Sequence, residues 1–144
     1  MNKYRSHKCD ELTKNDVGKN VSLAGWVNKK RDHGNLLFID LRDNYGITQC
    51  IIDKENSNFE KLEKIQLETV IKIDGEVIKR SKDSINKELK TGEIEVTIKN
   101  FEILGGCKEL PLPVFSDQEY AEEIRLKYRF LDLRRKKIHE NIIL

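Results

Sequence analysis

Hydrophobic and polar residues alternate along five stretches of the chain, which is the pattern of β-strands with one buried face. These stretches are residues 21–28, 36–43, 47–53, 68–79 and 92–104. The first three are separated by "DHGN" (32–35), whose glycine can adopt the positive φ angle of a tight turn, and by a second turn, "NYG" (44–46). They therefore predict a three-stranded meander.

The pattern changes between residues 56 and 66. Three hydrophobic residues recur there at helical spacing: Phe59, Leu62 and Ile65. Ser57 or Asn58 is a candidate N-cap, and a polar loop is expected over residues 80–91. Three strands, a short helix and two strands are the order of an OB-fold, a mainly β, five-stranded Greek-key barrel. Other small barrels share this order, so the OB-fold is a hypothesis at this point.

Residues 105–118 contain both prolines of the chain and two adjacent glycines, which predicts a linker. From residue 119 the sequence is helical in pattern and strongly basic. We therefore expect an OB-fold domain over 1–104, a linker over 105–118 and a helical segment over 119–144. The chain ends in the apolar run Ile142–Leu144, from which we expect it to be the front part of a longer protein.

Composition narrows the possible functions. With 38% hydrophobic and 36% charged residues over 144 positions, the chain suits one small domain with a highly charged surface. Its net charge of +2 is too small to indicate nucleic-acid binding, so a polyanion site must come from local clustering. Its cysteines are far apart and its start lacks a signal peptide, which favours a reducing cytosol. Its scattered histidines indicate no metal site, and no catalytic set of residues stands out.

Candidate chemistry lies on the second predicted strand. Because Leu37, Ile39 and Leu41 face the core, Phe38 projects from the outer surface of the predicted barrel. An exposed ring on this face can stack on an unpaired base, which contributes about 1–3 kcal/mol per base. Three basic residues can meet phosphates beside the ring: Lys29, Lys30 and Arg31. The alternative is that Trp26 or a loop covers the ring.

Two further side chains could contact a base. The Gln49 amide, on the neighbouring strand, both donates and accepts hydrogen bonds, which suits the Watson–Crick edge of an unstacked base. Glu95 faces outward on the last strand and could accept a hydrogen bond from a base amine or imino group. For each, an ordinary polar strand residue is the alternative. Structural roles are expected for Asp40, Arg42 and Asp43, paired with one another or with the lysines of the first strand.

Three motifs carry a resemblance to a known family: "GWVNKKRDHGNLLFIDLRDNYGITQ" (25–49), "TGEIEV" (91–96) and "RLKYRFLDLRR" (125–135). Together they resemble the N-terminal part of bacterial-type aspartyl-tRNA synthetases. The first motif is partly shared with lysyl- and asparaginyl-tRNA synthetases, which use the same anticodon-binding barrel, and the other two favour the aspartyl family. The resemblance covers essentially the whole chain.

This resemblance implies roles for particular residues. The ring of Phe38 stacks on the central anticodon base, a uridine, and the amide of Gln49 contacts the same base. Glu95 helps to recognise the first anticodon position. A loop region that touches the anticodon contains Asn28, Lys29 and Arg31.

Two positions bear on which tRNAs are accepted. His33 stands where some family members have leucine, and members that charge both aspartate and asparagine tRNAs often have histidine there. Ser84 lies near a second position linked to the same discrimination. We therefore expect tRNA(Asp) as a partner, and tRNA(Asn) as a second one.

The family activates aspartate with ATP and Mg²⁺ and transfers it to tRNA, in a class II catalytic domain. The resemblance implies that this domain starts at residue 119 and lies mostly beyond Leu144. The whole protein is then expected to be a cytoplasmic, homodimeric aspartate–tRNA ligase, and this chain an inactive tRNA-binding monomer without cofactor, metal or membrane contact. The alternatives are a free-standing OB protein that binds single-stranded nucleic acid, or the equivalent domain of a lysyl- or asparaginyl-tRNA synthetase.

Overall fold

The computed structural model describes residues 3–114 and 118–143, which belong to two compact units, residues 1–107 and 108–144. The first unit contains the strands β1 (Asn20–Asp32), β2 (Leu36–Arg42), β3 (Ile47–Asp53), β4 (Val70–Lys79) and β5 (Ile94–Gly105). It also contains the helix α1 (Phe59–Lys64) and two 3₁₀ turns, η1 (Lys14–Asp16) and η2 (Lys82–Ser84). The second unit contains α2 (Glu122–Lys127), α3 (Arg129–Asp132) and α4 (Lys136–Ile142).

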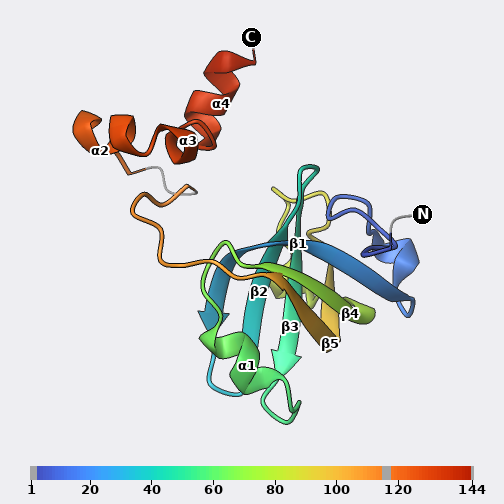
Figure 1. Ribbon diagram of the computed structural model, residues 1–144. Helices are drawn as coiled ribbons and strands as arrows, with labels where there is room; N and C mark the ends of the chain where they lie inside the picture. Colours follow the sequence, from blue (N-terminus) through green and yellow to red (C-terminus); the bar gives the residue numbers. More distant parts are fainter. Residues whose placement is uncertain (1–2, 115–117, 144) are drawn as a thin grey trace. The chain divides into compact units, whose positions relative to one another are not determined.

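The five strands form a closed barrel in the order β1-β2-β3-β5-β4 (Figure 1). All neighbouring strands are antiparallel except β3 and β5, which pair in parallel at Cys50 with Val96 and at Ile51 with Thr97. α1 lies in the connection from β3 to β4 (Figure 1). This is the five-stranded OB-fold with a helix between its third and fourth strands, so the predicted fold is confirmed.

The alternating residues of the strands build one hydrophobic core. On β2, Leu37, Ile39 and Leu41 are buried, so Phe38 lies on the outer face as predicted. The same core includes residues of the other strands, of α1 and of the segment before β1: Cys9, Leu12, Val21, Leu23, Cys50, Ile52, Phe59, Leu62, Ile71, Ile73, Val77, Ile94, Val96 and Ile98. Burial raises the pKa of the Cys9 and Cys50 thiols, which keeps both protonated and unreactive.

β1 is longer than its alternation indicated, because it continues through the basic residues that follow Asn28. An irregularity between Val27 and Lys29 interrupts the pairing of β1 with β2. Such a bulge adds one residue to a strand and reverses the faces to which the following side chains point. Beyond it, Arg31 pairs with Phe38, so both lie on the outer face of the barrel.

Lys30 points to the other side of the strand and caps α1. Its Nζ donates hydrogen bonds to the main-chain oxygens of Glu63, at 2.7 Å, and Ile65, at 2.6 Å. These carbonyls lie at the C-terminal end of the helix, where a cation is favourable. Burial lowers the pKa of Lys30. Contrary to the sequence-based expectation, Lys30 therefore stabilises the fold instead of facing a phosphate.

Arg42 forms a buried ion pair with the segment that precedes β4. It donates to both carboxylate oxygens of Glu68 at 2.9 Å, and the two side chains are 9% and 8% exposed. Asp43 accepts hydrogen bonds from the side chain of Arg5 at 3.1 Å and the main-chain nitrogen of Cys9 at 2.9 Å. Both residues thus have the structural roles expected of them, but they pair neither with each other nor with the lysines of the first strand, as had been predicted.

The second unit is held together by a buried carboxylate. Asp132 is fully buried and accepts hydrogen bonds from Arg125 at 3.1 Å, Arg129 at 2.8 Å and Arg135 at 3.3 Å. Burial by itself raises the pKa of this carboxyl, but the arginines outweigh it and hold the pKa below its ordinary value. The basic helical segment predicted from residue 119 is therefore a set of short helices around one acidic centre.

Part of the predicted linker packs into this second unit. Leu112 and Val114 are buried against Leu131, whereas residues 115–117 of that linker lie outside the described residues.

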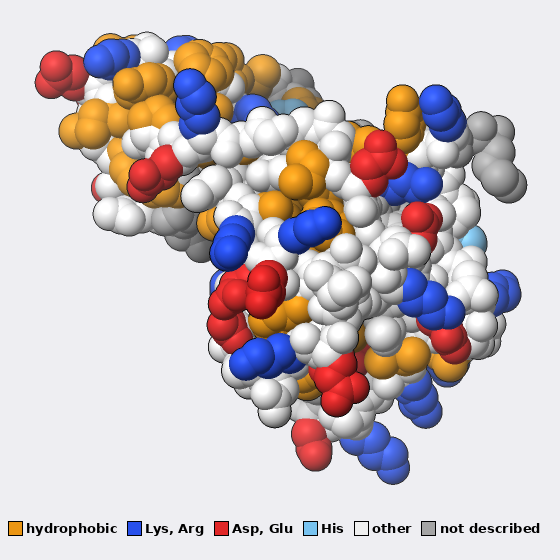
Figure 2. All heavy atoms as spheres, turned by 60° about the horizontal axis from the view of Figure 1, so that its bottom comes forward, with side chains coloured by type: hydrophobic (Ala, Val, Ile, Leu, Met, Phe, Trp, Pro, Cys, Tyr) orange, Lys and Arg blue, Asp and Glu red, His pale blue; other side chains and the backbone are white. Residues whose placement is uncertain are grey.

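Several apolar side chains of this unit are exposed: Ile124, Leu126, Phe130, Ile142 and Ile143. Figure 2 shows hydrophobic side chains gathered over this unit. No helix in the described part of the chain is long and apolar enough to cross a membrane.

Candidate nucleic-acid interface

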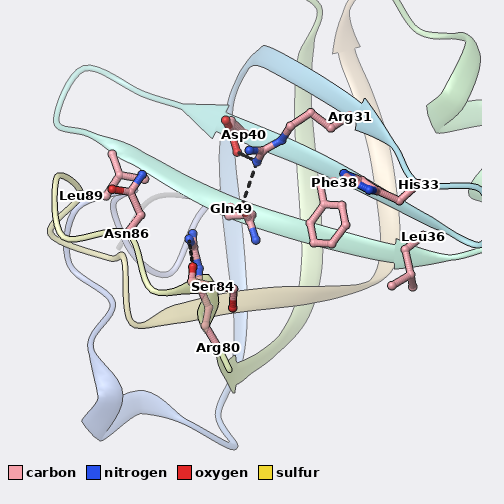
Figure 3. Close-up of a pocket in the computed structure, with 10 residues that line it drawn as sticks. All are labelled: Arg31, His33, Leu36, Phe38, Asp40, Gln49, Arg80, Ser84, Asn86 and Leu89. Atoms are coloured by element: carbon pink, nitrogen blue, oxygen red, sulfur yellow. Dashed lines mark hydrogen bonds and ion pairs between the residues drawn. The ribbon is translucent and has the colours of Figure 1, made fainter. Parts of the chain in front are cut away.

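A cavity of about 460 Å³ lies on the outer face of β2 and β3, beside the β4–β5 connection. It is lined by Arg31, His33, Leu36, Phe38, Asp40, Gln49, Arg80, Ser84, Asn86 and Leu89 (Figure 3). Most of the side chains proposed from the sequence to contact a base or to select the tRNA are therefore brought together here. The β4–β5 connection, predicted to be a polar loop that contains the specificity candidate Ser84, supplies one wall of the cavity.

Phe38 is the apolar centre of this cavity. The imidazole of His33 meets its ring edge to face, with 5.1 Å between centroids and 83° between planes. The guanidinium of Arg31 lies 5.9 Å from the ring centroid. Trp26, which could have covered the ring, instead lines a separate groove with Tyr45. The ring thus stands beside a cation and an imidazole in an open cavity, an arrangement suited to stacking a planar heterocycle.

The turn before β2 positions His33. Gly34 has a φ of +80°, the positive value predicted for the "DHGN" turn, and its main-chain nitrogen donates to Asp32 Oδ1 at 2.7 Å. The main-chain nitrogen of His33 donates to the Leu36 carbonyl at 2.9 Å. The side chain of His33 therefore starts from a fixed turn and reaches back over β2 to Phe38.

A polar network crosses the floor of the cavity. Arg31 Nη2 donates to Asp40 Oδ1 and to Gln49 Oε1, both at 2.9 Å (Figure 3). On its other side, Gln49 Nε2 donates to Glu95 Oε2 at 2.8 Å. Gln49 is 8% exposed, so its amide is held by neighbours on both sides. The prediction that Glu95 faces outward is confirmed. Glu95 does not itself line the cavity, but its carboxylate is hydrogen-bonded to Gln49, which does.

Arg80 lines this site although no role was predicted for it from the sequence; the same holds for Leu36, Asn86 and Leu89. Its guanidinium is buried, with Nε donating to the Ile94 carbonyl at 2.8 Å and Nη1 to the Ser84 carbonyl at 3.3 Å. The remaining nitrogen, Nη2, is buried without a hydrogen-bond partner among the described residues. Burial lowers the pKa of Arg80. No motif marks this arginine, because its partners are main-chain carbonyls that any sequence provides.

Two residues of the predicted site lie away from the cavity. Asn28 Oδ1 accepts a hydrogen bond from Arg42 Nη1 at 2.8 Å and so supports the buried ion pair. Lys29 is exposed opposite Asp40 in the β1–β2 pairing but does not line the cavity. Both belong to β1, where the resemblance implied a loop. Their expected contacts with the anticodon stay a prediction.

Charge around the cavity is mixed. Arg31 and Arg80 are cationic, whereas Asp40 and Glu95 are anionic and lie within hydrogen-bonding reach of the network. Figure 2 likewise shows acidic and basic side chains interspersed over the face of the barrel that it presents. A site of this kind is suited to a ligand with its own donors and acceptors, such as a base edge, more than to a bare polyanion.

A closed five-stranded barrel with a stacking ring and hydrogen-bonding groups on its β2–β3 face has the architecture of OB-fold proteins that bind nucleic acid. The chain belongs to the tRNA anticodon family of OB-fold nucleic acid binding domains, whose family model matches residues 21–104.

Alignments with curated relatives extend over all or nearly all of this chain. It is 76% identical over 144 residues to the aspartate–tRNA(Asp/Asn) ligase of Pelagibacter ubique (strain HTCC1062). It is 57% identical over 143 residues, 99% of its length, to the aspartate–tRNA(Asp/Asn) ligase of Agrobacterium fabrum (strain C58 / ATCC 33970). The chain spans 24% of the length of each of these two relatives.

A solved structure of related architecture is that of asparaginyl-tRNA synthetase from Pyrococcus horikoshii complexed with asparaginyl-adenylate. It is 29% identical, with a TM-score of 0.75, and the match covers 91% of this chain and 29% of that one. Sequence and fold therefore both place the chain in the tRNA anticodon family of OB-fold domains. The aspartate–tRNA(Asp/Asn) ligases, at 76% and 57% identity, are much more similar to it in sequence than the asparaginyl-tRNA synthetase, at 29%.

Proposed function

We propose that this chain is the anticodon-binding part of an aspartate–tRNA ligase that acts on both tRNA(Asp) and tRNA(Asn). The observation that carries the proposal is the Phe38 ring, set beside the polar network of Arg31 and Gln49 in an open cavity. The similarity to curated ligases of this name supports the choice of amino acid and tRNA. Because the chain spans a quarter of those relatives, the catalytic activity belongs to the whole protein.

In this proposal an unstacked anticodon base lies against Phe38. Its Watson–Crick edge meets the Gln49 amide, which keeps one hydrogen and one lone pair beyond those bound by Arg31 and Glu95. Arg80 offers a buried, unpaired N–H to a base or sugar oxygen that enters the cavity. The carboxylate of Glu95 accepts a hydrogen bond from a donor on the neighbouring base, at the first anticodon position, as the family resemblance implies.

Acceptance of two tRNAs would be decided at the rim of the cavity. His33 and Ser84 lie on different connections of the barrel, yet both line the same cavity as Phe38. A base next to the one stacked on Phe38 would therefore be close to both. We propose that an imidazole at position 33 tolerates either pyrimidine at the third anticodon position, as required for tRNA(Asp) and tRNA(Asn).

ATP and Mg²⁺ are proposed ligands of the whole protein. In residues 3–114 and 118–143, no three His, Cys, Asp or Glu side chains come together as ligands for a metal ion. We assign both ligands to the whole protein and derive no chemical step from the residues of this chain. The homodimer and the cytoplasmic location implied by the resemblance remain predictions for the whole protein.

Titration of RNA hairpins tests the proposed function. The chain is expected to bind a hairpin with a GUC anticodon loop more tightly than hairpins of the same stem with unrelated loops, measured by fluorescence anisotropy at fixed salt. A free-standing single-strand-binding protein would instead bind the loops with equal affinity, because stacking and phosphate contacts alone tolerate any sequence. Equal affinities would therefore contradict the anticodon assignment.

Aminoacylation by the whole protein tests the second tRNA. We expect aspartate to be attached to transcripts of both tRNA(Asp) and tRNA(Asn), and the His33→Leu variant to lose more activity on the second than on the first. Charging of tRNA(Asp) alone by the unmodified protein would show that the enzyme is specific for one tRNA.

A further inference from the structure

We infer that Asp40 is a positioning residue that makes the site selective for uracil over cytosine, by fixing Arg31 and, through it, the orientation of the Gln49 amide. This inference rests on the proposed function, because it concerns the base that lies against Phe38. Asp40 itself is assigned no contact with the base.

The hydrogen bonds around Gln49 determine which end of its amide points where. Arg31 has only donors, so the atom that faces its Nη2 at 2.9 Å must be the Gln49 oxygen. The carboxylate of Glu95 has only acceptors, so the atom that faces it at 2.8 Å must be the amide nitrogen. The two neighbours therefore permit one orientation of the amide and exclude the flipped one.

Amide orientation is what separates uracil from cytosine. The Watson–Crick edge of uracil presents an N3–H donor beside a carbonyl acceptor, whereas that of cytosine presents an N3 acceptor beside an amino donor. An amide that pairs with uracil through its oxygen and nitrogen would have to rotate by a half-turn to pair with cytosine. A fixed Gln49 amide therefore favours one of these two bases, and a free amide could serve both.

Asp40 holds the arginine that fixes the oxygen end of this amide, whereas Glu95 holds the nitrogen end. The Arg31 side chain is 40% exposed, so by itself it is free to turn toward solvent or toward an RNA phosphate. The Asp40 carboxylate, 16% exposed on the neighbouring strand, accepts from the same Nη2 atom that donates to Gln49. The ion pair thus keeps the guanidinium beside Gln49 and over the Phe38 ring.

The expected signature of this role is a loss of selectivity without a loss of affinity. In an Asp40→Ala variant, one negative charge is removed from the RNA-binding face and Arg31 becomes free to meet phosphate. Binding of RNA in general should become tighter and more dependent on salt. Selectivity for a loop with central uracil over one with central cytosine should fall by roughly two- to tenfold, the range that one hydrogen bond supplies.

The experiment compares dissociation constants of the 144-residue chain for hairpins with GUC and GCC loops at two salt concentrations. Asp40→Asn, which keeps an acceptor oxygen, should show intermediate selectivity. Glu93→Gln is the matched control. Glu93 is exposed just before β5, and its replacement by glutamine removes one negative charge, as Asp40→Ala does. It should change general affinity while the uracil-to-cytosine ratio stays at the unmodified value. An unchanged ratio in Asp40→Ala would overturn the inference.

A second measurement needs no RNA. The Gln49 side-chain amide signals in a ¹⁵N–¹H spectrum of the free chain should shift in Asp40→Ala and stay in place in Glu93→Gln. Unchanged Gln49 signals in Asp40→Ala would refute the positioning role even if the chain binds no anticodon loop. Failure of the unmodified chain to prefer the GUC loop, together with shifted Gln49 signals, would reject the proposed function and support the positioning of Gln49 by Asp40.

Discussion

Replacing Phe38 with alanine is expected to weaken binding of a GUC anticodon hairpin by about 1–3 kcal/mol, the contribution of one base stacked on an aromatic ring. The ring lies on the outer face of β2 and lines the open cavity, so its removal takes little from the core. Binding is measured by fluorescence anisotropy, and the thermal midpoint of unfolding is expected to change little.

The neighbouring residue provides the matched control for this prediction. Ile39 is fully buried on the opposite face of β2, and its replacement by alanine should cost about 2–5 kcal/mol of stability. Tyr45→Ala, which removes a ring that is 47% exposed elsewhere on the barrel, should leave loop binding unchanged. A large fall in stability for Phe38→Ala with unchanged binding would show that the ring belongs to the core.

Replacing Arg42 with methionine is expected to lower the free energy of unfolding by about 3–5 kcal/mol. The Glu68 carboxylate, 8% exposed, would lose both hydrogen bonds and the opposite charge that Arg42 provides. Removal of one partner of a buried pair is costly because the other charge stays out of water. The free energy is measured by urea denaturation, followed by circular dichroism.

A double variant distinguishes this buried pair from a general loss of packing. Arg42→Met combined with Glu68→Gln should lose less stability than the sum of the two single variants, because it leaves no buried charge. The exposed pair of Lys99 and Glu76, whose side chains are 52% and 42% exposed, serves as the control. Lys99→Met should cost less than about 1 kcal/mol. Additive losses in the double variant would contradict the role given to the ion pair.

Alternation of residues was sufficient to predict the barrel and the outward position of Phe38. β2 obeys it from Leu36 to Leu41, and burial of Leu37, Ile39 and Leu41 requires the residues between them to face outward. Alternation failed at the end of β1, because consecutive polar residues carry no period and because a bulge after Val27 reverses the faces. That bulge is what brings Arg31 to the outer face beside Phe38.

Partners far apart in the sequence could not be predicted from local pattern. Gln49 and Glu95 lie 46 positions apart and Arg42 and Glu68 lie 26 apart, so only the closed barrel brings them together. The resemblance to tRNA synthetases supplied roles for Gln49 and Glu95, but not the hydrogen bond between them. Arg80 stayed unnoticed because its partners are main-chain carbonyls.

Mapping of the bound RNA by NMR tests whether the β2–β3 cavity is the anticodon site. The ¹⁵N–¹H and aromatic ¹³C–¹H signals of the chain are recorded during titration with the GUC hairpin. We expect the largest changes at Phe38, Gln49 and His33, and no change on the surface around Tyr45. Changes centred on the Tyr45 groove, with the Phe38 and Gln49 signals unmoved, would contradict the assignment of the β2–β3 cavity as the anticodon site.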